Sequence, residues 1–323
     1  MAHARKKQIS LETTPSYHVV SRCVRRTFLF GCFENKDFSH RRQLIVERLA
    51  ELANVFCIAI SAFAIMSNHY HLVVRIQKQQ ALGLDAHDVI RRWNSLFRLP
   101  VLAERFSRQI PMSAAETAAV HTIIETWRNR LYDLSWFMRC LNEHIARIAN
   151  AEDQCTGRFW EGRFKSQALL DEKAELQAMA YVDLNPIRAD MASSPEHSDY
   201  TSIQLRMTKD NNSPMKHLLR PFAGNAHQDN NPNDIPYNLI EYIQLVDWSG
   251  RQIHPQKHGV IADSLPPIFT QLNMQHHIWL RNCLSLESTY HRVIGPAARM
   301  QEFCALMHQK WLLGIPAARE AFG

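Results

Sequence analysis

Two histidines stand two residues apart, His69 and His71, in a β-prone run that reads HYHLVVRI. Because side chains alternate between the two faces of a strand, both imidazoles should project to the same side. Two neutral imidazoles placed in this way can chelate one metal ion. Histidine pairs with this spacing more often lie at a surface or pack around a residue such as Tyr70, so the motif needs further residues to support it.

A phenol and two amides share one row of a predicted helix at residues 171–185. Gln177, Tyr181 and Asn185 are spaced i, i+4, i+8, apart from the apolar stripe that contains Leu176 and Met179. Pro186 should end the helix and turn Asn185 away from helical torsions. Taken singly, a half-buried tyrosine and a helix-ending asparagine would be ordinary structural residues.

Basic and aromatic residues alternate in the segment GRFWEGRFKS, residues 157–166. Arg158, Arg163 and Lys165 can neutralise phosphates, and aromatic rings such as that of Trp160 can stack on unpaired bases. Strands of this composition are also common at ordinary solvated sheet edges, so an edge strand is the alternative.

Hydrophobic periodicity predicts the elements that position these residues. The predicted order is strand, helix, strand, strand, helix, strand and a final helix. That order fits an α+β fold, a ferredoxin-like antiparallel sheet with helices on one face. The corresponding segments are residues 17–22, 36–53, 57–66, 69–76, 134–149, 157–170 and 171–185.

The remaining segments lie outside this pattern. Residues 77–130 contain helical stretches and form a predicted insertion within a catalytic domain of residues 1–206. Asparagine-rich residues 207–236 are expected to be a linker, and residues 237–323 a mostly helical C-terminal extension whose role the sequence does not indicate.

Composition narrows the class of protein. The chain has 323 residues, 46% hydrophobic and 21% charged, as in an ordinary globular protein, and its net charge of +6 favours polyanionic partners. Seven scattered cysteines without a C-x-x-C pair are expected to be free thiols. Without a signal peptide or a long apolar run, a cytoplasmic protein that does not enter membranes is expected.

Together, MSNHYHLVV (residues 66–74), GRFWEGRFKS and YVDLNPIRA (residues 181–189), with YHVVSR near the start, resemble the REP-associated tyrosine transposases. These are single-tyrosine HUH endonucleases, and the resemblance covers roughly residues 17–200. The long insertion and extension depart from the compact members of the family.

The resemblance implies that His69 and His71 hold a divalent metal, Mg²⁺ or Mn²⁺, that Asn185 is the third protein ligand, and that Tyr181 is the nucleophile. It implies a DNA transposition and recombination enzyme that cuts single-stranded or hairpin DNA, forms a 5′-phosphotyrosine intermediate and rejoins strands without ATP. The expected DNA-binding residues are Arg22, Arg25, Arg26, Arg75, Arg158, Trp160, Arg163, Lys165 and Arg188.

Three alternatives stay open at this point. A catalytically silent DNA-binding regulator would keep the fold and the basic surface without turnover. A phosphodiesterase that uses water would not need Tyr181. The residues also leave open whether the active site forms within one chain or across a homodimer.

Overall fold

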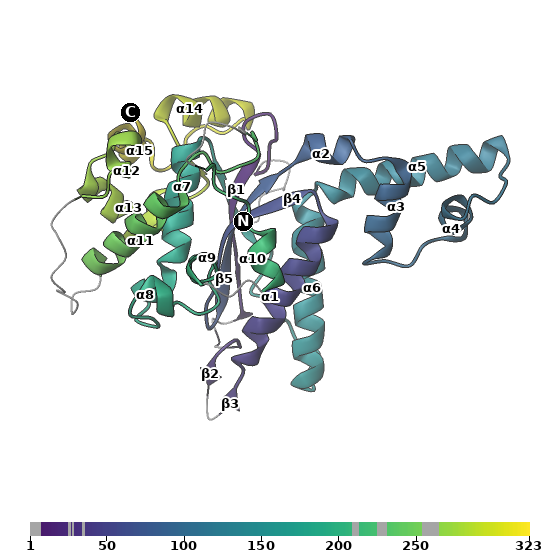
Figure 1. Ribbon diagram of the computed structural model, residues 1–323, viewed down its shortest axis with the longest axis horizontal. Helices are drawn as coiled ribbons and strands as arrows, with labels where there is room; N and C mark the ends of the chain where they lie inside the picture. The colour runs from purple at the N-terminus through teal and green to yellow at the C-terminus, as the bar shows by residue number, and fades with distance from the viewer. Residues whose placement is uncertain are drawn as a thin grey trace.

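A central β-sheet carries the candidate site. The computed structural model describes residues 8–24, 27, 29–33, 36–208, 213–224, 231–253 and 265–323. Within them the five sheet strands lie in the order β4-β5-β1-β6-β7 (Figure 1). They are β1 (Ser16–Arg22), β4 (Ile58–Ile65), β5 (His69–Ile76), β6 (Lys165–Leu169) and β7 (Val293–Ile294).

The expected ferredoxin-like arrangement is confirmed. The first strand along the chain, β1, lies between β5 and β6, and all pairings among β4, β5, β1 and β6 are antiparallel. With β4, β5 and β6 as the second, third and fourth strands of the motif, the order across the sheet is 4-1-3-2, as in a ferredoxin-like unit. The short β7 extends the sheet by pairing with β6 in parallel, which the sequence did not predict.

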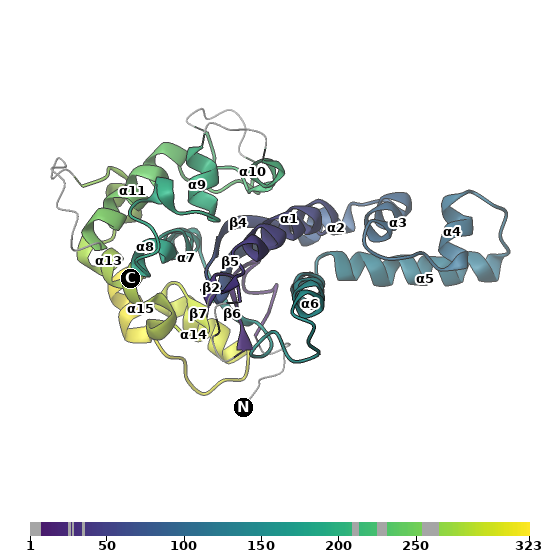
Figure 2. The ribbon, with the colours of Figure 1, turned by 90° about the horizontal axis from the view of Figure 1, so that it is seen from below.

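The expectation that the helices lie on one face was wrong for the last of them. Helices α1 (His40–Val55) and α6 (Leu134–Glu152) cover one face of the sheet, and α7 (Glu172–Asp183) covers the other (Figure 2). On the α6 side, the Tyr70 hydroxyl donates to Asn142 Oδ1 at 2.6 Å. Because alternate residues face opposite ways, the neighbours of Tyr70 along β5, His69 and His71, point to the α7 side. The helix that carries Tyr181 therefore packs on the face that carries both histidines.

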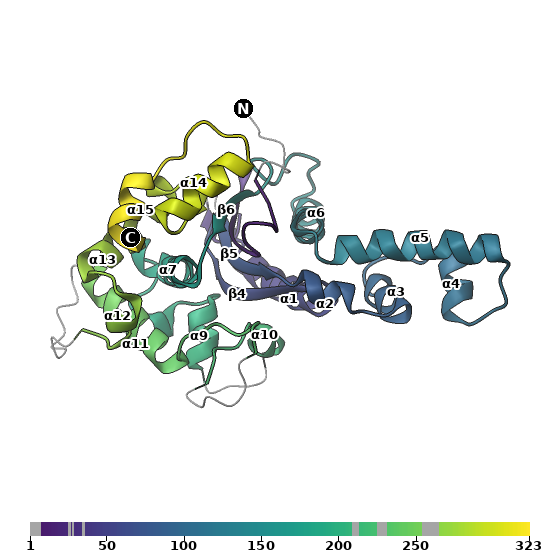
Figure 3. The ribbon, with the colours of Figure 1, turned by 90° about the horizontal axis from the view of Figure 1, so that it is seen from above.

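The expected insertion is an arm of helices that projects from the sheet (Figures 1 and 3). Its longest helix, α5 (Ala114–Leu131), starts at a capping box. The Ser113 side chain accepts a hydrogen bond from the Glu116 backbone N–H, and the Glu116 side chain accepts one from the Ser113 backbone N–H. The arm contains α2 (Lys78–Leu82), α3 (Ala86–Asn94), α4 (Val101–Ser107) and α5 (Ala114–Leu131).

The C-terminal extension packs on α7. Every α7 residue from Ala174 to Asp183 is buried, because the extension covers the side of the helix that faces away from the sheet. For example, the Tyr242 hydroxyl donates to Asp183 Oδ2 at 2.6 Å. The helices of this region are α11 (Leu239–Ile253), α12 (Ile268–Leu272), α13 (His276–Thr289), α14 (Ala297–Leu306) and α15 (Ile315–Phe322).

Part of the segment expected to be a linker also packs on the sheet. Residues 213–224 include α10 (Pro214–Leu218), and Arg220 N–H donates to Ile60 O of β4 at 2.8 Å. The guanidinium of Arg220 reaches Glu175 of α7 at 2.6 Å. The domain boundary at residues 207–236 stays a prediction, but its described part is in contact with β4 and α7.

Two local predictions were wrong. The predicted strand at residues 157–170 is regular only from Lys165, because the aromatic rings of Phe159 and Trp160 turn in to pack around Phe30, with ring centroids 5.6 and 5.8 Å from it. The helix α7 does end before Pro186, at Asp183, but Asn185 does not leave helical torsions as expected. Asn185 begins a new short helix, α8 (Asn185–Arg188), and Pro186 occupies its first turn, where a missing backbone N–H costs nothing.

All seven cysteines are free, as expected from their spacing. Within the part of the chain that the structure describes, no helix combines the length and apolar character that a membrane span requires. The remaining described elements are short. They are β2 (Cys32–Phe33), β3 (Lys36–Asp37), the 3₁₀ turn Pro195–His197 and α9 (Ser202–Met207).

Candidate active site

A buried row of polar side chains crosses the sheet at the centre of the α7 face. His18 of β1 lies directly opposite Gln167 of β6 and diagonally opposite His71 of β5. His18 Nδ1 is 2.6 Å from Gln167 Oε1, and His18 Nε2 is 2.9 Å from His71 Nδ1. Both histidines are buried, with exposed fractions of 0% and 1%. The row therefore holds the two imidazoles in fixed orientations.

Tyr181 lies over this row. Its ring centroid is 5.9 Å from that of His71 and 5.9 Å from that of His18, in both cases edge to face. The side chain reaches this position because residue 181 lies on the α7 surface that packs against the sheet. The structure thus brings together Tyr181 and His71, which stand far apart in the sequence.

His69 is adjacent but more exposed. Its ring centroid is 4.9 Å from that of His71, and its Nδ1 is 2.6 Å from Asn68 Oδ1. Asn185 is buried at the start of α8, and its Nδ2 has no hydrogen-bond partner among the described residues. His69 therefore lies beside His71.

The extension contributes a carboxylate that sequence reasoning missed. Glu287 of α13 places Oε1 at 3.5 Å from His71 Nδ1 and at 3.4 Å from the Tyr181 hydroxyl. Its Oε2 accepts from Arg22 of β1 at 2.9 Å. His18 was missed as well, although its motif YHVVSR and its position on the same strand face as Arg22 were signals for it. Glu287 has no such signal in the sequence.

The residues present fit a divalent metal ion. Ligand atoms of His18, His71 and Glu287 all lie within 4.8 Å of one another. The 2.9 Å hydrogen bond between His18 Nε2 and His71 Nδ1 places a proton on one of these nitrogens, so both can bind one ion only when that hydrogen bond breaks. His71 Nε2 offers a further donor, because it is buried without a hydrogen-bond partner among the described residues.

The structure groups His18, His71 and Glu287, whereas the expected ligands are His69, His71 and Asn185. His71 is common to both sets, and the expected set stays a prediction. Burial lowers the pKa of His71 well below its usual value, assisted by the neighbouring His69, and burial also lowers the pKa of His18. Both imidazoles are then neutral near pH 7, which is the form that binds a metal.

An arginine covers the outer side of the phenol. The Arg188 guanidinium carbon lies 3.8 Å from the centroid of the Tyr181 ring, and Arg188 also donates to Leu284 O at 3.3 Å. Burial raises the pKa of Tyr181, and the charge of Arg188 opposes that rise. A cation in this position would favour both a phenolate and a phosphate next to it.

The other expected DNA-binding residues occupy several environments. Arg158, Arg163 and Lys165 are exposed, whereas Trp160 is half-buried and donates its indole N–H to Asn142 O at 2.8 Å. Arg75 lies on the histidine side of β5 and donates to Ser16 Oγ at 3.3 Å. Arg25 and Arg26 lie outside the described residues.

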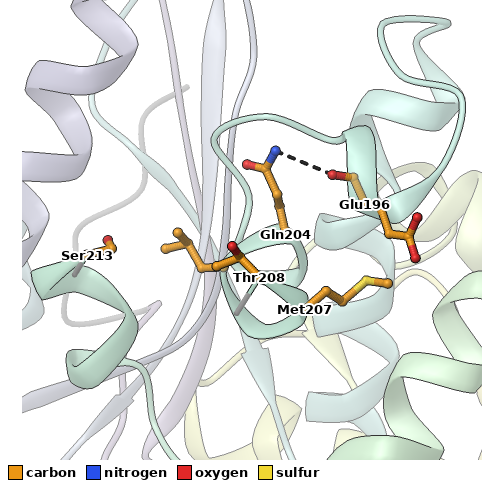
Figure 4. Close-up of a pocket in the computed structure, with 6 residues that line it drawn as sticks. Glu196, Gln204, Met207, Thr208 and Ser213 are labelled. Atoms are coloured by element: carbon orange, nitrogen blue, oxygen red, sulfur yellow. Dashed lines mark hydrogen bonds between the residues drawn. The ribbon is translucent and has the colours of Figure 1, made fainter. Parts of the chain in front are cut away.

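A separate cavity of about 400 Å³ lies near α9 (Figure 4). Gln204 donates to Glu196 O across it at 3.4 Å. The described residues that line it are Glu196, Gln204, Leu205, Met207, Thr208 and Ser213. Because they include neither an imidazole nor a phenol, this cavity does not compete with the Tyr181 site as a place for the expected chemistry.

Comparison with known proteins gave one solved structure. It is described as a REP-associated tyrosine transposase bound to a REP hairpin, and it matches with 11% identity and a TM-score of 0.38 over 63% of this chain and 84% of that chain. No family model and no curated protein matches the chain. The matched structure belongs to the family that the sequence motifs resemble.

Proposed function

We propose that this protein cuts and rejoins single-stranded DNA through a transient covalent bond between Tyr181 and a 5′-phosphate. One observation carries the proposal: the Tyr181 phenol and the His71 imidazole share a buried site, with ring centroids 5.9 Å apart. A nucleophile and a metal-binding imidazole can act on one phosphate only if they are this close. The resemblance of the three sequence motifs to HUH transposases supports the same activity.

The reaction follows from the groups in the site. The Tyr181 oxygen forms a bond to the scissile phosphorus, the bond to the 3′-oxygen breaks, and a free 3′-hydroxyl leaves. Attack by a 3′-hydroxyl reverses these steps and joins strands, so the energy of the phosphodiester is kept in the protein–DNA bond. A bound Mg²⁺ or Mn²⁺ would polarise the phosphate and stabilise the negative charge that develops on it in the transition state.

Glu287 is the nearest group for the phenol proton. The Tyr181 hydroxyl is 3.4 Å from Glu287 Oε1, so this carboxylate can accept the proton during attack and return it during joining. Arg188, 3.8 Å from the phenol ring, can hold a phosphate oxygen.

DNA must displace part of this arrangement. Tyr181 is only 6% exposed, and the ion pair between Arg22 and Glu287 lies beside it. A phosphate that binds Arg22 would compete with Glu287 for the same guanidinium and open the site. We expect the substrate to be a DNA hairpin with a short unpaired segment, as the resemblance implies.

The test is formation of a protein–DNA adduct. Hairpin DNA labelled on the 3′ side of the cut is incubated with protein and Mn²⁺, and an SDS-resistant labelled complex is expected. Tyr181→Phe should abolish the complex, and Tyr132→Phe, a tyrosine of the distant arm, should leave it intact. An adduct that persists in Tyr181→Phe rejects Tyr181 as nucleophile, and cleavage without any adduct assigns the reaction to water.

The closed site favours one second candidate, a DNA-binding regulator without turnover. In that case the Arg22–Glu287 pair would stay in place and keep phosphates away from Tyr181. Hairpin binding with no cleavage and no adduct under Mg²⁺, Mn²⁺ or other divalent ions would support this alternative.

A further inference from the structure

A cavity of about 780 Å³ lies where the helical arm joins the core. Its walls come from α1, α3, α5 and α6 and from the residues that follow α3. Helices α1 and α6 cover the sheet face opposite Tyr181, so this cavity is separate from the candidate active site. Its size lies within the range of about 300–1,000 Å³ that is usual for ligand sites, and it has room for a nucleotide.

Aromatic rings form one side of the cavity. Trp93 stacks on Trp127 with centroids 5.4 Å apart and an interplanar angle of 9°, and Trp136 meets Trp93 edge to face at 5.8 Å. Phe97 lies 4.5 Å from Trp93 and 6.4 Å from Trp136. Trp93 and Trp127 are buried, whereas Phe97 and Trp136 are half-buried and remain accessible from the cavity.

Arginines lie against these rings. The guanidinium carbon of Arg130 lies 4.2 Å from the centroid of the Trp136 ring, and that of Arg139 lies 5.1 Å from the same centroid. Arg139 and Arg147 both contact one carboxylate, that of Glu143.

The charge of the lining is therefore unbalanced. Five arginines line the cavity, the three just named together with Arg48 and Arg98, and Glu143 is the single carboxylate among the described residues of the lining. Glu51, outside the lining, pairs with Arg48 at 2.7 Å. Two carboxylates cannot neutralise five guanidinium groups, so the cavity favours an anionic ligand.

We infer that this cavity, the arm cavity, binds an unpaired segment of a DNA strand. Half-buried aromatic rings packed with an excess of arginines are the combination that single-strand binding uses, because bases stack on rings and on guanidinium planes while cations neutralise the backbone. A duplex would fit less well, since its bases are already stacked on each other. The inference does not require the nicking chemistry, because binding can be measured without cleavage.

The test removes two cations that line the arm cavity. The variant Arg139→Gln/Arg147→Gln of α6 is compared with Arg91→Gln/Arg108→Gln, which removes two arginines of the helical arm that lie outside the cavity lining. The pairs are well matched, because each of the four side chains is 63–76% exposed and contacts a carboxylate of its own or the adjoining turn. All proteins carry Tyr181→Phe and are studied without metal, so the catalytic reaction does not contribute.

Binding of a fluorescent oligothymidylate of about 15 nucleotides is measured by anisotropy at several salt concentrations. The cavity variant should bind about tenfold more weakly, and the slope of log affinity against log salt should fall by about 0.7 for each phosphate that the variant no longer neutralises. Photocrosslinking of an iodouracil oligonucleotide should label peptides that contain Trp136 or Phe97.

Three outcomes would overturn the inference. One is equal affinity and equal salt slope in the cavity and control variants. Another is crosslinking confined to peptides outside the arm cavity. The third is selective binding of an acidic peptide at the cavity with no loss of oligonucleotide affinity in the cavity variant, which would assign the cavity to a protein ligand. Failure of the adduct assay leaves each of these readouts unaffected.

Discussion

The buried ion pair between Arg220 and Glu175 allows a quantitative test of how the C-terminal region supports the site. Arg220 Nη1 lies 2.6 Å from Glu175 Oε1, and the two side chains are only 3% and 4% exposed. Glu175 also accepts from Ser61 Oγ at 2.8 Å and from Ser16 Oγ at 3.1 Å. Glu175 lies in the first turn of α7, so this network ties the segment after α10 to the helix that carries Tyr181.

Arg220→Met should lower the free energy of unfolding by about 3–5 kcal/mol, because it leaves the carboxylate of Glu175 buried without its charged partner. Combining it with Glu175→Gln should recover much of the loss, since neither charge is then buried. The free energy is measured by urea denaturation at pH 7 for the parent, both single variants and the double variant.

The control is Arg281→Met, which removes a guanidinium from an exposed pair with Glu320 at 2.7 Å. This change should cost less than about 1 kcal/mol, as is usual for surface pairs. The prediction is refuted if Arg220→Met lowers the free energy of unfolding no more than Arg281→Met does. It is also refuted if the effects of Arg220→Met and Glu175→Gln simply add in the double variant. Either result would mean that Arg220 is not packed between the sheet and α7.

Two further predictions concern single carboxylates. Burial raises the pKa of Asp183 from 3.8 to about 6, so its contribution to stability is fully present below about pH 4 and is lost as pH rises through about 6. The difference in unfolding free energy between the parent and Asp183→Asn should therefore change by on the order of 3 kcal/mol across that window, and a pH-independent difference would contradict the raised pKa. Glu287→Gln should weaken Mn²⁺ binding, measured by electron paramagnetic resonance of the free ion, by about tenfold or more, while Glu302→Gln on the exposed side of α14 should not. If Glu287→Gln leaves the Mn²⁺ affinity unchanged, Glu287 is not a metal ligand. Its roles are then the ion pair with Arg22 and acceptance of the phenol proton.

Local periodicity was sufficient to predict most of the core. Alternating apolar residues predicted β1 and the β4–β5 hairpin, and the two-residue spacing predicted that His69 and His71 face the same way. Helical spacing likewise indicated that Tyr181 is on a different row from Leu176. These features depend on residues a few positions apart, which is why the sequence alone determines them.

Tertiary structure decided which groups surround the phenol. The 2.9 Å contact between His18 and His71 depends on the register of β1 against β5, and no pattern within either strand specifies that register. Glu287 comes from α13, whose own sequence carries no motif, and it reaches His71 only because the extension folds over α7. A site assembled from segments so distant in the chain depends on packing, so the fold and one face of the site could be read from sequence, but the complete set of donors could not.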